Sequence, residues 1–396
     1  MRYLLTILLF TTVFSAAQTQ SIVQYDFESR MDGISLLWTG DTLNFWGFRD
    51  LNDTTTTEAI LPGPTIYCNV GDSVIINMTN PSFEAHTIHL HGLDVDQAND
   101  GVPSTSFFIQ PNQTGTYSFR ATQSGNYLYH CHVGTVLHLQ LGMYGAVIVR
   151  LANNIKEVYP GGPTYDRDFE WLNIEVDKSW HDDYTSIGAF TSYEPDYFHV
   201  NGKSKQDIKA DSSTSIYNAY VGEKILLRLM NVGYGINQYL FPQGITTSQI
   251  TSDGRALPNV IINDTLRIFP GERYGVLFEA TQILNDSIEI QYLSMYQDKI
   301  WGKEYVPIVV NRLSPLEIEK EQINYFYPNP FAEVLNYQGE IGGGTVEIFD
   351  LNGKRLLKKE VSREEIINLE DLTSGIYIIK LFENGKEPVL RKLVKK

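Results

Sequence analysis

The amino-acid sequence predicts an all-β protein made of several β-sandwich or barrel units. Short segments rich in Val, Ile, Tyr, Phe and Thr recur from residue 18 onward, separated by Gly, Pro, Asn and Asp. No long stretch has the period of a helix. The length of 396 residues corresponds to roughly two to four domains. Hydrophobic residues make up 42% of the chain, which is enough for several buried cores and excludes a disordered chain.

The N-terminal segment has the composition of a secretory signal. Arg2 is followed by an apolar run over residues 4–14 and by small residues at 15–17, where a signal peptidase would cut. The apolar run is shorter than the roughly 20 residues needed to cross a bilayer. We therefore interpret residues 1–17 as a removable leader. The formal charge of -16 disfavours nucleic acid as a partner, because phosphates repel an acidic surface.

Turn residues divide the rest of the chain into three predicted units. The first covers residues 18–152 and is followed by a linker with the turn chemistry Pro160-Gly161-Gly162-Pro163. The second covers residues 165–313, and a small third unit covers residues 323–396. Strands are predicted at Val74–Asn77, Gly115–Phe119, Asn126–His132, Ala146–Val149, Lys224–Met230 and Tyr274–Glu279.

Histidines cluster in the first unit. Six of the eight lie between residues 86 and 138, together with one of the two cysteines. Side chains alternate between faces along a strand, so Cys131 points away from His130 and His132. The same parity sets His86 apart from the two histidines that follow it. Two groups result, one with His86 and Cys131 and one with His89, His91, His130 and His132.

Downstream residues complete the first group. His138 lies seven positions after Cys131, and Met143 lies five positions after His138. Two His, one Cys and a weak axial Met are the ligands of a blue electron-transfer copper. Four imidazoles without a thiolate suit copper that binds and reduces a small molecule. The peptide His130-Cys131-His132 joins both groups and offers electrons a covalent path between them.

Other interpretations of these residues are weaker. A structural zinc site needs only four ligands and usually has a simpler spacing. A disulfide between Cys68 and Cys131 is possible in an exported protein, but it would leave the flanking histidines without a purpose. We interpret Cys68 as a small buried residue.

The motifs resemble those of multicopper oxidases, members of the cupredoxin superfamily related to laccases. The resemblance is carried by His86-x-x-His89-x-His91-Gly92 and by His130-Cys131-His132 with His138 and Gly142-Met143. It implies two cupredoxin-like Greek-key β-sandwiches and copper as the cofactor. It also implies that a phenolic, organic or metal-ion reductant is oxidised while dioxygen is reduced. His86, Cys131, His138 and Met143 would hold type 1 copper, His89, His91, His130 and His132 would hold type 2/type 3 copper, and Cys131, His130 and His132 would be the catalytic electron path.

The second unit resembles the copper-free middle domain of three-domain laccases. Its histidines, His181 and His199, are interpreted as structural. A complete type 2/type 3 cluster in that family takes eight histidines, and this chain offers four at matching positions. We therefore expect a homo-oligomer in which two copies pool their histidines.

Two alternatives within copper chemistry remain open. In copper nitrite reductases, His91 and His130 would match two catalytic ligands, and a neighbour's His199 or His181 could supply a third. His89 and His132 are the extra histidines that favour an oxidase. A non-enzymatic copper or electron carrier would need only the first ligand group.

The third unit resembles the type A sorting domain of the type IX secretion system of Bacteroidetes. Segments Tyr327–Phe331, Val346–Lys354 and Leu372–Lys380 and the basic C-terminus carry this resemblance. It implies that the secretion machinery is a partner and that export runs through the periplasm and across the outer membrane. The alternative is a small immunoglobulin-like adhesion domain.

Overall fold

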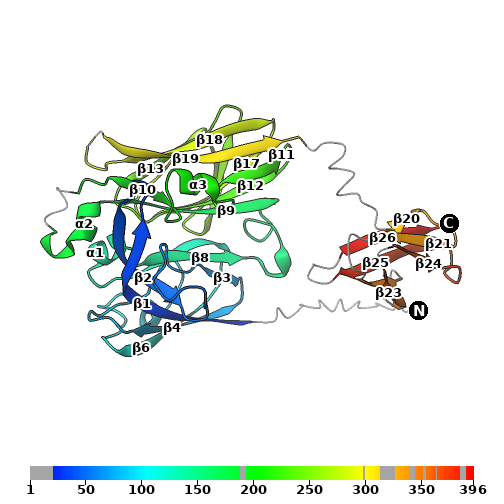
Figure 1. Cartoon of the computed structure of the whole chain (residues 1–396), viewed down its shortest axis with the longest axis horizontal. Helices are drawn as coiled ribbons and strands as arrows, with labels where there is room; N and C mark the ends of the chain where they lie inside the picture. Colours follow the sequence, from blue (N-terminus) through cyan, green and yellow to red (C-terminus); the bar gives the residue numbers. More distant parts are fainter. Residues whose placement is uncertain are drawn as a thin grey trace, which may run out of the picture. The chain divides into compact units, whose positions relative to one another are not determined.

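The computed structural model describes residues 21–187, 193–297, 299–312, 326–338, 344–350, 354–362, 364–383 and 389–396. The predicted leader at 1–17 and the predicted boundaries at 313 and 323 lie outside these ranges. The chain divides into two compact units, residues 1–312 and 313–396. The first unit contains two β-sandwiches and the second contains one, as the sequence predicts (Figure 1).

The first sandwich consists of two four-stranded sheets, β2-β1-β4-β6 and β3-β8-β7-β5. β1 runs parallel to β4 and β3 runs parallel to β8, whereas the remaining neighbours are antiparallel. Phe27, Val74, Tyr117 and Tyr129 are fully buried between the sheets. The elements are β1 Ile22–Leu36, β2 Thr42–Asp50, β3 Ile66–Asn69, β4 Ser73–Asn80, β5 His89–His91, η1 Gln97–Asn99, β6 Gln113–Arg120, β7 Gly125–His130, α1 Thr135–Gln140, β8 Tyr144–Arg150 and η2 Ala152–Asn154.

One strand prediction needs a correction. The strand predicted to run to His132 ends at His130. The reason is local, because the His132 N–H donates to the Thr87 hydroxyl at 2.7 Å and not to a neighbouring strand. The other predicted strands of this sandwich lie within β4, β6 and β8.

The second sandwich repeats the pairing scheme of the first in larger sheets, β10-β9-β12-β17-β14-β15 and β11-β19-β18-β13-β16. β9 runs parallel to β12 and β11 runs parallel to β19. The strands predicted at 224–230 and 274–279 lie within β12 and β17. The elements are β9 Arg167–Val176, α2 Lys178–Asp182, η3 Tyr184–Ser186, β10 Tyr197–Val200, α3 Gln206–Ala210, β11 Ile216–Tyr220, β12 Lys224–Asn231, β13 Ile236–Leu240, β14 Thr247–Ser252, β15 Arg255–Asn263, β16 Thr265–Ile268, β17 Arg273–Glu279, β18 Leu284–Leu293 and β19 Ile300–Asn311.

An apolar interface joins the first two sandwiches into one unit. Leu128 and Tyr144 of the first sandwich pack in one buried cluster with Ile174 and Met230 of the second. These side chains are at most 1% exposed. Burial of apolar surface contributes roughly 25 cal/mol per Å², so this contact fixes the second sandwich against the first.

The C-terminal unit is a separate small sandwich with its own core. Its sheets have the orders β20-β21-β24 and β23-β22-β25-β26, around buried residues such as Phe331, Leu335 and Ile379. The part of the predicted sorting motif at 351–353 lies outside the described residues. The strands are β20 Phe326–Tyr327, β21 Val334–Gln338, β22 Gly344–Phe349, β23 Arg355–Val361, β24 Glu364–Asn368, β25 Gly375–Glu383 and β26 Val389–Lys395.

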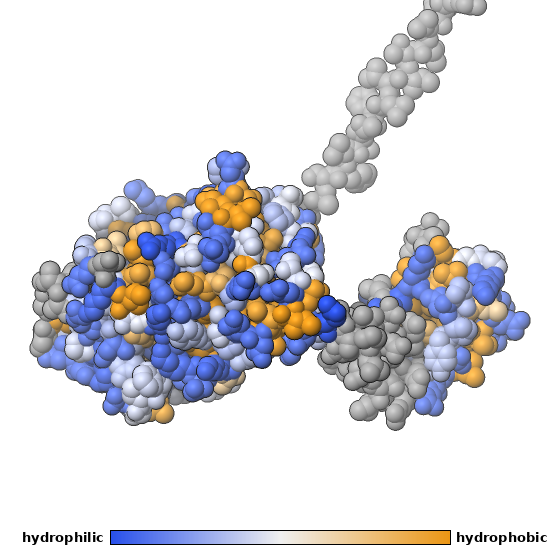
Figure 2. Space-filling view, turned by 90° about the horizontal axis from the view of Figure 1, so that it is seen from above, coloured by the Kyte–Doolittle hydropathy of each residue, from blue (hydrophilic) through white to orange (hydrophobic). Residues whose placement is uncertain are grey.

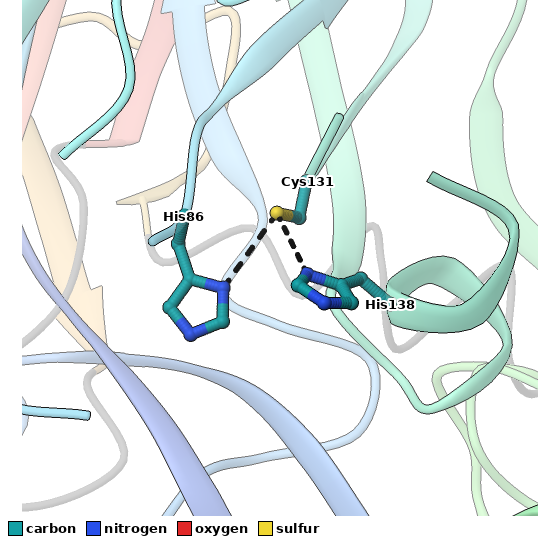
Figure 3. Close-up of side chains that lie close together, drawn as sticks. All are labelled: His86, Cys131 and His138. Atoms are coloured by element: carbon teal, nitrogen blue, oxygen red, sulfur yellow. Dashed lines mark hydrogen bonds between the residues drawn. The ribbon is translucent and has the colours of Figure 1, made fainter. Parts of the chain in front are cut away.

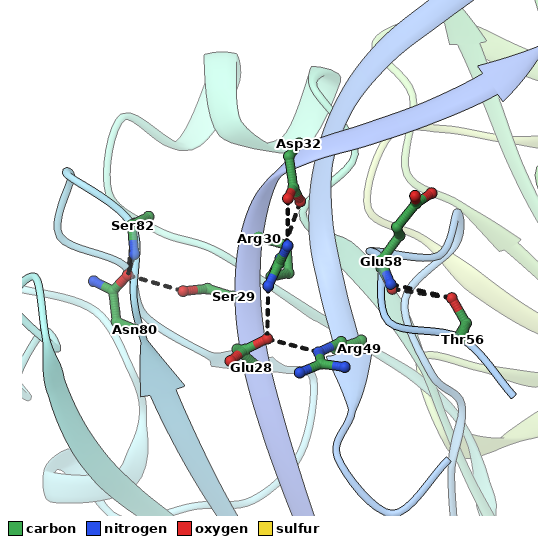
Figure 4. A network of polar contacts seen from close by, with 9 residues as sticks. All are labelled: Glu28, Ser29, Arg30, Asp32, Arg49, Thr56, Glu58, Asn80 and Ser82. Carbon is green, nitrogen blue, oxygen red and sulfur yellow. Dashed lines mark hydrogen bonds and ion pairs between the residues drawn. The ribbon is translucent and has the colours of Figure 1, made fainter. Parts of the chain in front are cut away.

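Polar contacts join the first two strands of the first sandwich. Glu28 of β1 accepts a hydrogen bond from Arg49 of β2 at 2.6 Å and pairs with Arg30 at 3.3 Å (Figure 4).

Hydrophilic residues cover most of the face seen in Figure 2, with smaller hydrophobic areas between them. Within the described ranges, none of the helices is long and apolar enough to span a membrane.

Candidate metal centres

One cysteine and two histidines meet in the core of the first sandwich. The Sγ atom of Cys131 lies 3.2 Å from Nδ1 of His138 and 3.7 Å from Nδ1 of His86. Figure 3 shows both imidazole rings turning a nitrogen toward the sulfur. All three side chains are at most 2% exposed. Two imidazole nitrogens and a sulfur within 4.8 Å of one another form a donor set that can hold one metal ion.

Short backbone contacts bring these three residues together from separate elements. His86 exchanges two backbone hydrogen bonds with Ile109, at 3.1 and 2.8 Å. Cys131 follows β7, and its N–H donates to the Met143 carbonyl at 3.0 Å. The Met143 N–H donates in turn to the carbonyl of His138 on α1. The loop between cysteine and methionine is therefore closed by its own backbone.

A buried amide fixes the loop that carries His86. The side chain of Asn80 accepts a hydrogen bond from Ser29 of β1 at 2.9 Å, as Figure 4 shows. Its Nδ2 donates to the Glu84 carbonyl at 2.7 Å and to the Ile109 carbonyl at 2.9 Å. The sandwich framework thus holds both sides of the segment that presents His86.

In the metal-free protein, the Cys131 thiol carries a proton that a bound metal would displace. Burial raises the pKa of the Cys131 thiol to about 11, so the metal-free cysteine is protonated at neutral pH. Burial, with a smaller contribution from His138, lowers the pKa of His86 to about 3. The Thr87 N–H donates to the sulfur at 3.5 Å, which stabilises a thiolate there. Met143 is fully buried in the same core cluster, and its role as an axial ligand stays a prediction.

The second predicted group also comes together, on the other side of the Cys131 backbone. β5 pairs with β7 so that His89 lies directly opposite His130. Nδ1 of His91 lies 3.3 Å from Nε2 of His130, and the ligand atoms of His89, His91 and His130 all lie within 4.8 Å of one another. The His132 ring packs against His89 with the centroids 5.2 Å apart, but His132 is not part of this three-ligand group.

Hydrogen bonds to backbone carbonyls orient two of these imidazoles. Nδ1 of His89 donates to the Asp100 carbonyl at 2.7 Å, and Nδ1 of His130 donates to the Cys131 carbonyl at 3.0 Å. Each ring therefore keeps Nε2 available as a ligand atom. Gly101, at φ +74°, allows the Asp100 turn, because a Cβ there would lie 2.0 Å from the Ile88 carbonyl oxygen.

Burial also keeps two imidazoles of this second group, His91 and His130, neutral. It lowers the pKa of His130 to about 3. For His91, burial and then the charge of Arg273 lower the pKa to about 4. Neutral imidazoles are the form that binds metal, so these rings require no deprotonation at neutral pH.

The remaining histidines and Cys68 belong to neither group. His181 donates to the backbone carbonyl of Asn44 at 2.7 Å and so links the two sandwiches. Burial lowers the pKa of His181 and of His199 to about 4. Both cysteines are free, and Cys68 is buried in the core as predicted.

Sequence reasoning missed two charged residues beside these groups. Glu84 accepts a hydrogen bond from Nε2 of His138 at 3.1 Å. Its position two residues before His86 was the only available signal. Arg273 approaches His91 from the second sandwich. The two residues are 182 positions apart in the sequence, so no local sequence pattern predicts the contact.

The fold and the two donor groups define a cupredoxin-type protein. The ligand atoms in both groups are of the kinds that bind copper. Family models described as multicopper oxidase match residues 48–154 and 169–291, and one for a secretion system C-terminal sorting domain matches residues 325–396. The chain belongs to the multicopper oxidase family and ends in a sorting domain, which marks it for secretion or export to the cell surface.

Individual relatives and solved structures agree with this family. The chain is 31% identical to copper resistance protein A of Escherichia coli over 171 residues, covering 43% of this chain and 26% of the relative. It is 29% identical to laccase-7 of Oryza sativa subsp. japonica over 252 residues, covering 61% and 43%. The chain thus spans less than half of these relatives. The blue copper oxidase of Nitrosomonas europaea has a TM-score of 0.60 at 27% identity, covering 73% of this chain and 86% of that one.

Proposed function

We propose that this chain is an exported copper-dependent oxidase that takes single electrons from a small reductant and reduces dioxygen at its histidine cluster. One observation carries the proposal. Cys131 faces the first donor group, while its chain neighbour His130 belongs to the second. The two groups are therefore joined by a continuous covalent backbone.

The donor atoms fit copper in both groups. His86, Cys131, His138 and Met143 would hold type 1 copper, and His89, His91, His130 and His132 would hold type 2/type 3 copper. Bound copper supplies one-electron redox chemistry at these positions. Cys131 and its neighbours provide the electron path, and the buried surroundings of His86 and Cys131 exclude water from it.

Glu84 and His138 form the side of the first group that faces solvent. The Glu84 side chain is 36% exposed, whereas the ring of His138 is 3% exposed. A reductant that reaches Glu84 is one hydrogen bond away from a ligand of the first group. A carboxylate at this position, on a chain of net charge -16, favours cationic or hydrogen-bond-donating reductants such as phenols, amines and metal ions.

We further propose that two copies complete the oxygen-reducing cluster. β5 is an edge strand of its sheet, and both of its histidines are partly exposed. A second copy related by a twofold axis would bring four more histidines to the first four. Metal analysis combined with oligomeric mass tests this arrangement. A strictly monomeric protein with full copper that reduces dioxygen to water would contradict it.

The route of export follows from the two ends of the chain. Residues 1–17 would direct the chain to the periplasm, and the unit at 323–396 would then direct it through the type IX machinery. The mature units would be 18–152 and 165–313. Mass spectrometry of the extracellular protein tests this route, because an intact Met1 or an intact Lys396 would argue against the corresponding signal.

The central experiment combines copper content, visible absorption and oxygen uptake. We expect an intense blue band and oxygen consumption with a phenolic dye. Activity with nitrite under argon, but none with the dye in air, would indicate a nitrite reductase. A blue band with neither activity would indicate a carrier.

A further inference from the structure

The helix that carries His138 is too short to fix its own position. α1 has six residues, and no side chain caps its first turn. Isolated helices shorter than about 12 residues are marginal in water, so packing against the rest of the chain decides where α1 lies. His138 points from this helix toward Cys131, whose Sγ atom lies 3.2 Å from Nδ1 of the ring. A small movement of α1 therefore changes the geometry of the first donor group.

Contacts from β2 hold one side of α1 within the first sandwich. The ring of Trp46 packs edge-on against the ring of His138, with the centroids 5.1 Å apart. The Trp46 N–H also donates to the carbonyl of Leu141, the residue after the helix, at 2.8 Å. These two contacts fix the end of α1 against the framework of the first sandwich.

The second sandwich holds the other side of α1 through a buried amide. Gln140 lies two residues after His138, so the two side chains leave the helix roughly 200° apart. Gln140 is 1% exposed, and its Nε2 donates to the Glu175 carbonyl of β9 at 3.1 Å. Its Oε1 accepts from the Asp177 N–H at 3.1 Å. Both ends of the amide are thus bound to one backbone segment of the second sandwich.

A second contact ties the same helix nearer its start. Tyr234, between β12 and β13, donates its hydroxyl to the Val136 carbonyl of α1. The Tyr234 ring packs edge-on against Tyr193, with the centroids 5.2 Å apart. The Tyr193 hydroxyl in turn donates to the Glu175 carbonyl at 2.8 Å. The second sandwich therefore holds α1 at two positions, one before and one after His138.

We propose that the second sandwich sets the distance and angle between His138 and Cys131 by holding α1 through Gln140 and Tyr234. These two are positioning residues, because they act through the helix and not on the donor atoms. The described residues of the second sandwich supply no donor atom to the first group, so these contacts give that sandwich its influence on it. The inference rests on the proposed copper occupancy of the first group.

Copper(II) affinity and the blue band of the full-length protein test this role. Gln140→Met keeps the side-chain volume but removes both hydrogen bonds. We expect it to weaken copper binding at the first group by about tenfold and to shift the band. Tyr234→Phe should change both in the same direction and by less, since Gln140 remains.

Asn126→Leu is the matched control. Asn126 is also a buried amide that joins the sandwiches, because its Nδ2 donates to the Leu229 carbonyl at 3.0 Å, but it lies on β7 and not on α1. It should unfold at lower urea concentration than the wild type and keep the wild-type affinity and band. Equal spectral changes in Gln140→Met and Asn126→Leu would overturn the assignment, as would wild-type affinity and an unshifted band in Gln140→Met.

Two further measurements keep the test decisive. If Gln140→Met does not fold, wild-type values in both Tyr234→Phe and Gln140→Glu would overturn the assignment. Histidine side-chain NMR of the metal-free protein separates this result from a failure of the proposed function. Even if the wild type binds no copper, Gln140→Met should shift the imidazole resonances of His138 and leave those of His91 in place. Unshifted His138 resonances would overturn the assignment.

Discussion

His138 and Glu84 form a hydrogen bond that links the buried donor group to the protein surface. Nε2 of His138 donates to Oε2 of Glu84 at 3.1 Å, while Nδ1 of the same ring lies 3.2 Å from Cys131. One imidazole therefore connects the sulfur with a carboxylate that solvent reaches. The residues that would hold a metal are therefore in direct contact with the carboxylate that we propose meets the reductant.

Glu84→Gln should reduce the efficiency with cationic reductants more than with neutral ones. The substitution removes the charge but keeps an acceptor for His138. We expect kcat/KM to fall roughly fivefold for a cationic reductant, corresponding to about 1 kcal/mol of lost surface electrostatics. Steady-state kinetics at two salt concentrations measures the effect. Glu58→Gln, at another exposed carboxylate, is the control, and an equal loss in both variants would refute a specific role for Glu84.

Cys131→Ser should abolish the blue absorption of the copper-loaded protein. A serine hydroxyl cannot replace the thiolate that gives such sites their colour. Cys68→Ala is the matched control, because Cys68 is also buried but lies outside both donor groups. We expect it to cost about 1 kcal/mol of stability and to keep the band. A blue band in Cys131→Ser would mean that another residue binds the copper.

Gly101→Ala should disrupt the support of His89. The new methyl group would collide with the Ile88 carbonyl, and the backbone would be strained at φ +74°. We expect a loss of roughly 3 kcal/mol in the free energy of unfolding and less copper at the histidine group. Gly161→Ala is the control for backbone strain alone, since Gly161 has φ +73° and open space around its Cβ position. It should cost roughly 1–2 kcal/mol and keep its copper. Urea unfolding and metal analysis measure both, and equal losses would contradict a specific clash.

Glu175 should make the metal-free protein less stable as the pH rises from about 4.5 to 7. Burial raises the pKa of Glu175 from 4.5 to about 7, although the backbone N–H groups of Tyr234 and Gly235 partly offset this. Between these pH values the unfolded chain releases the Glu175 proton and the folded chain keeps it. The free energy of unfolding therefore falls as the pH rises through this range. The loss is roughly 3 kcal/mol at full extent.

Glu175→Gln is expected to remove this part of the pH dependence. Urea unfolding of the metal-free protein between pH 5 and 8 should show the variant gaining on the wild type as the pH rises. The difference between the two proteins isolates Glu175 from the buried histidines, whose lowered pKa values act in the opposite direction. A flat difference for Glu175→Gln would mean that this carboxyl titrates normally.

The all-β class and most of the two donor groups could be predicted from the amino-acid sequence. Alternation along the strand separates Cys131 from His130, whereas His132 lies beyond the end of β7 and outside the three-ligand group. Spacing was sufficient for His138, because one short helix spans the distance to Cys131. These are local relationships, fixed by covalent geometry over a few residues.

Which residues surround the donor groups depends on the tertiary packing of the two sandwiches. The pairing of β5 with β7 placed His89 opposite His130 and left His132 outside the three-ligand group. The apolar interface between the sandwiches brought Arg273 to His91. Such contacts depend on how two buried surfaces pack, and the packing energy is spread over many side chains distant in sequence. For that reason no single motif could reveal them.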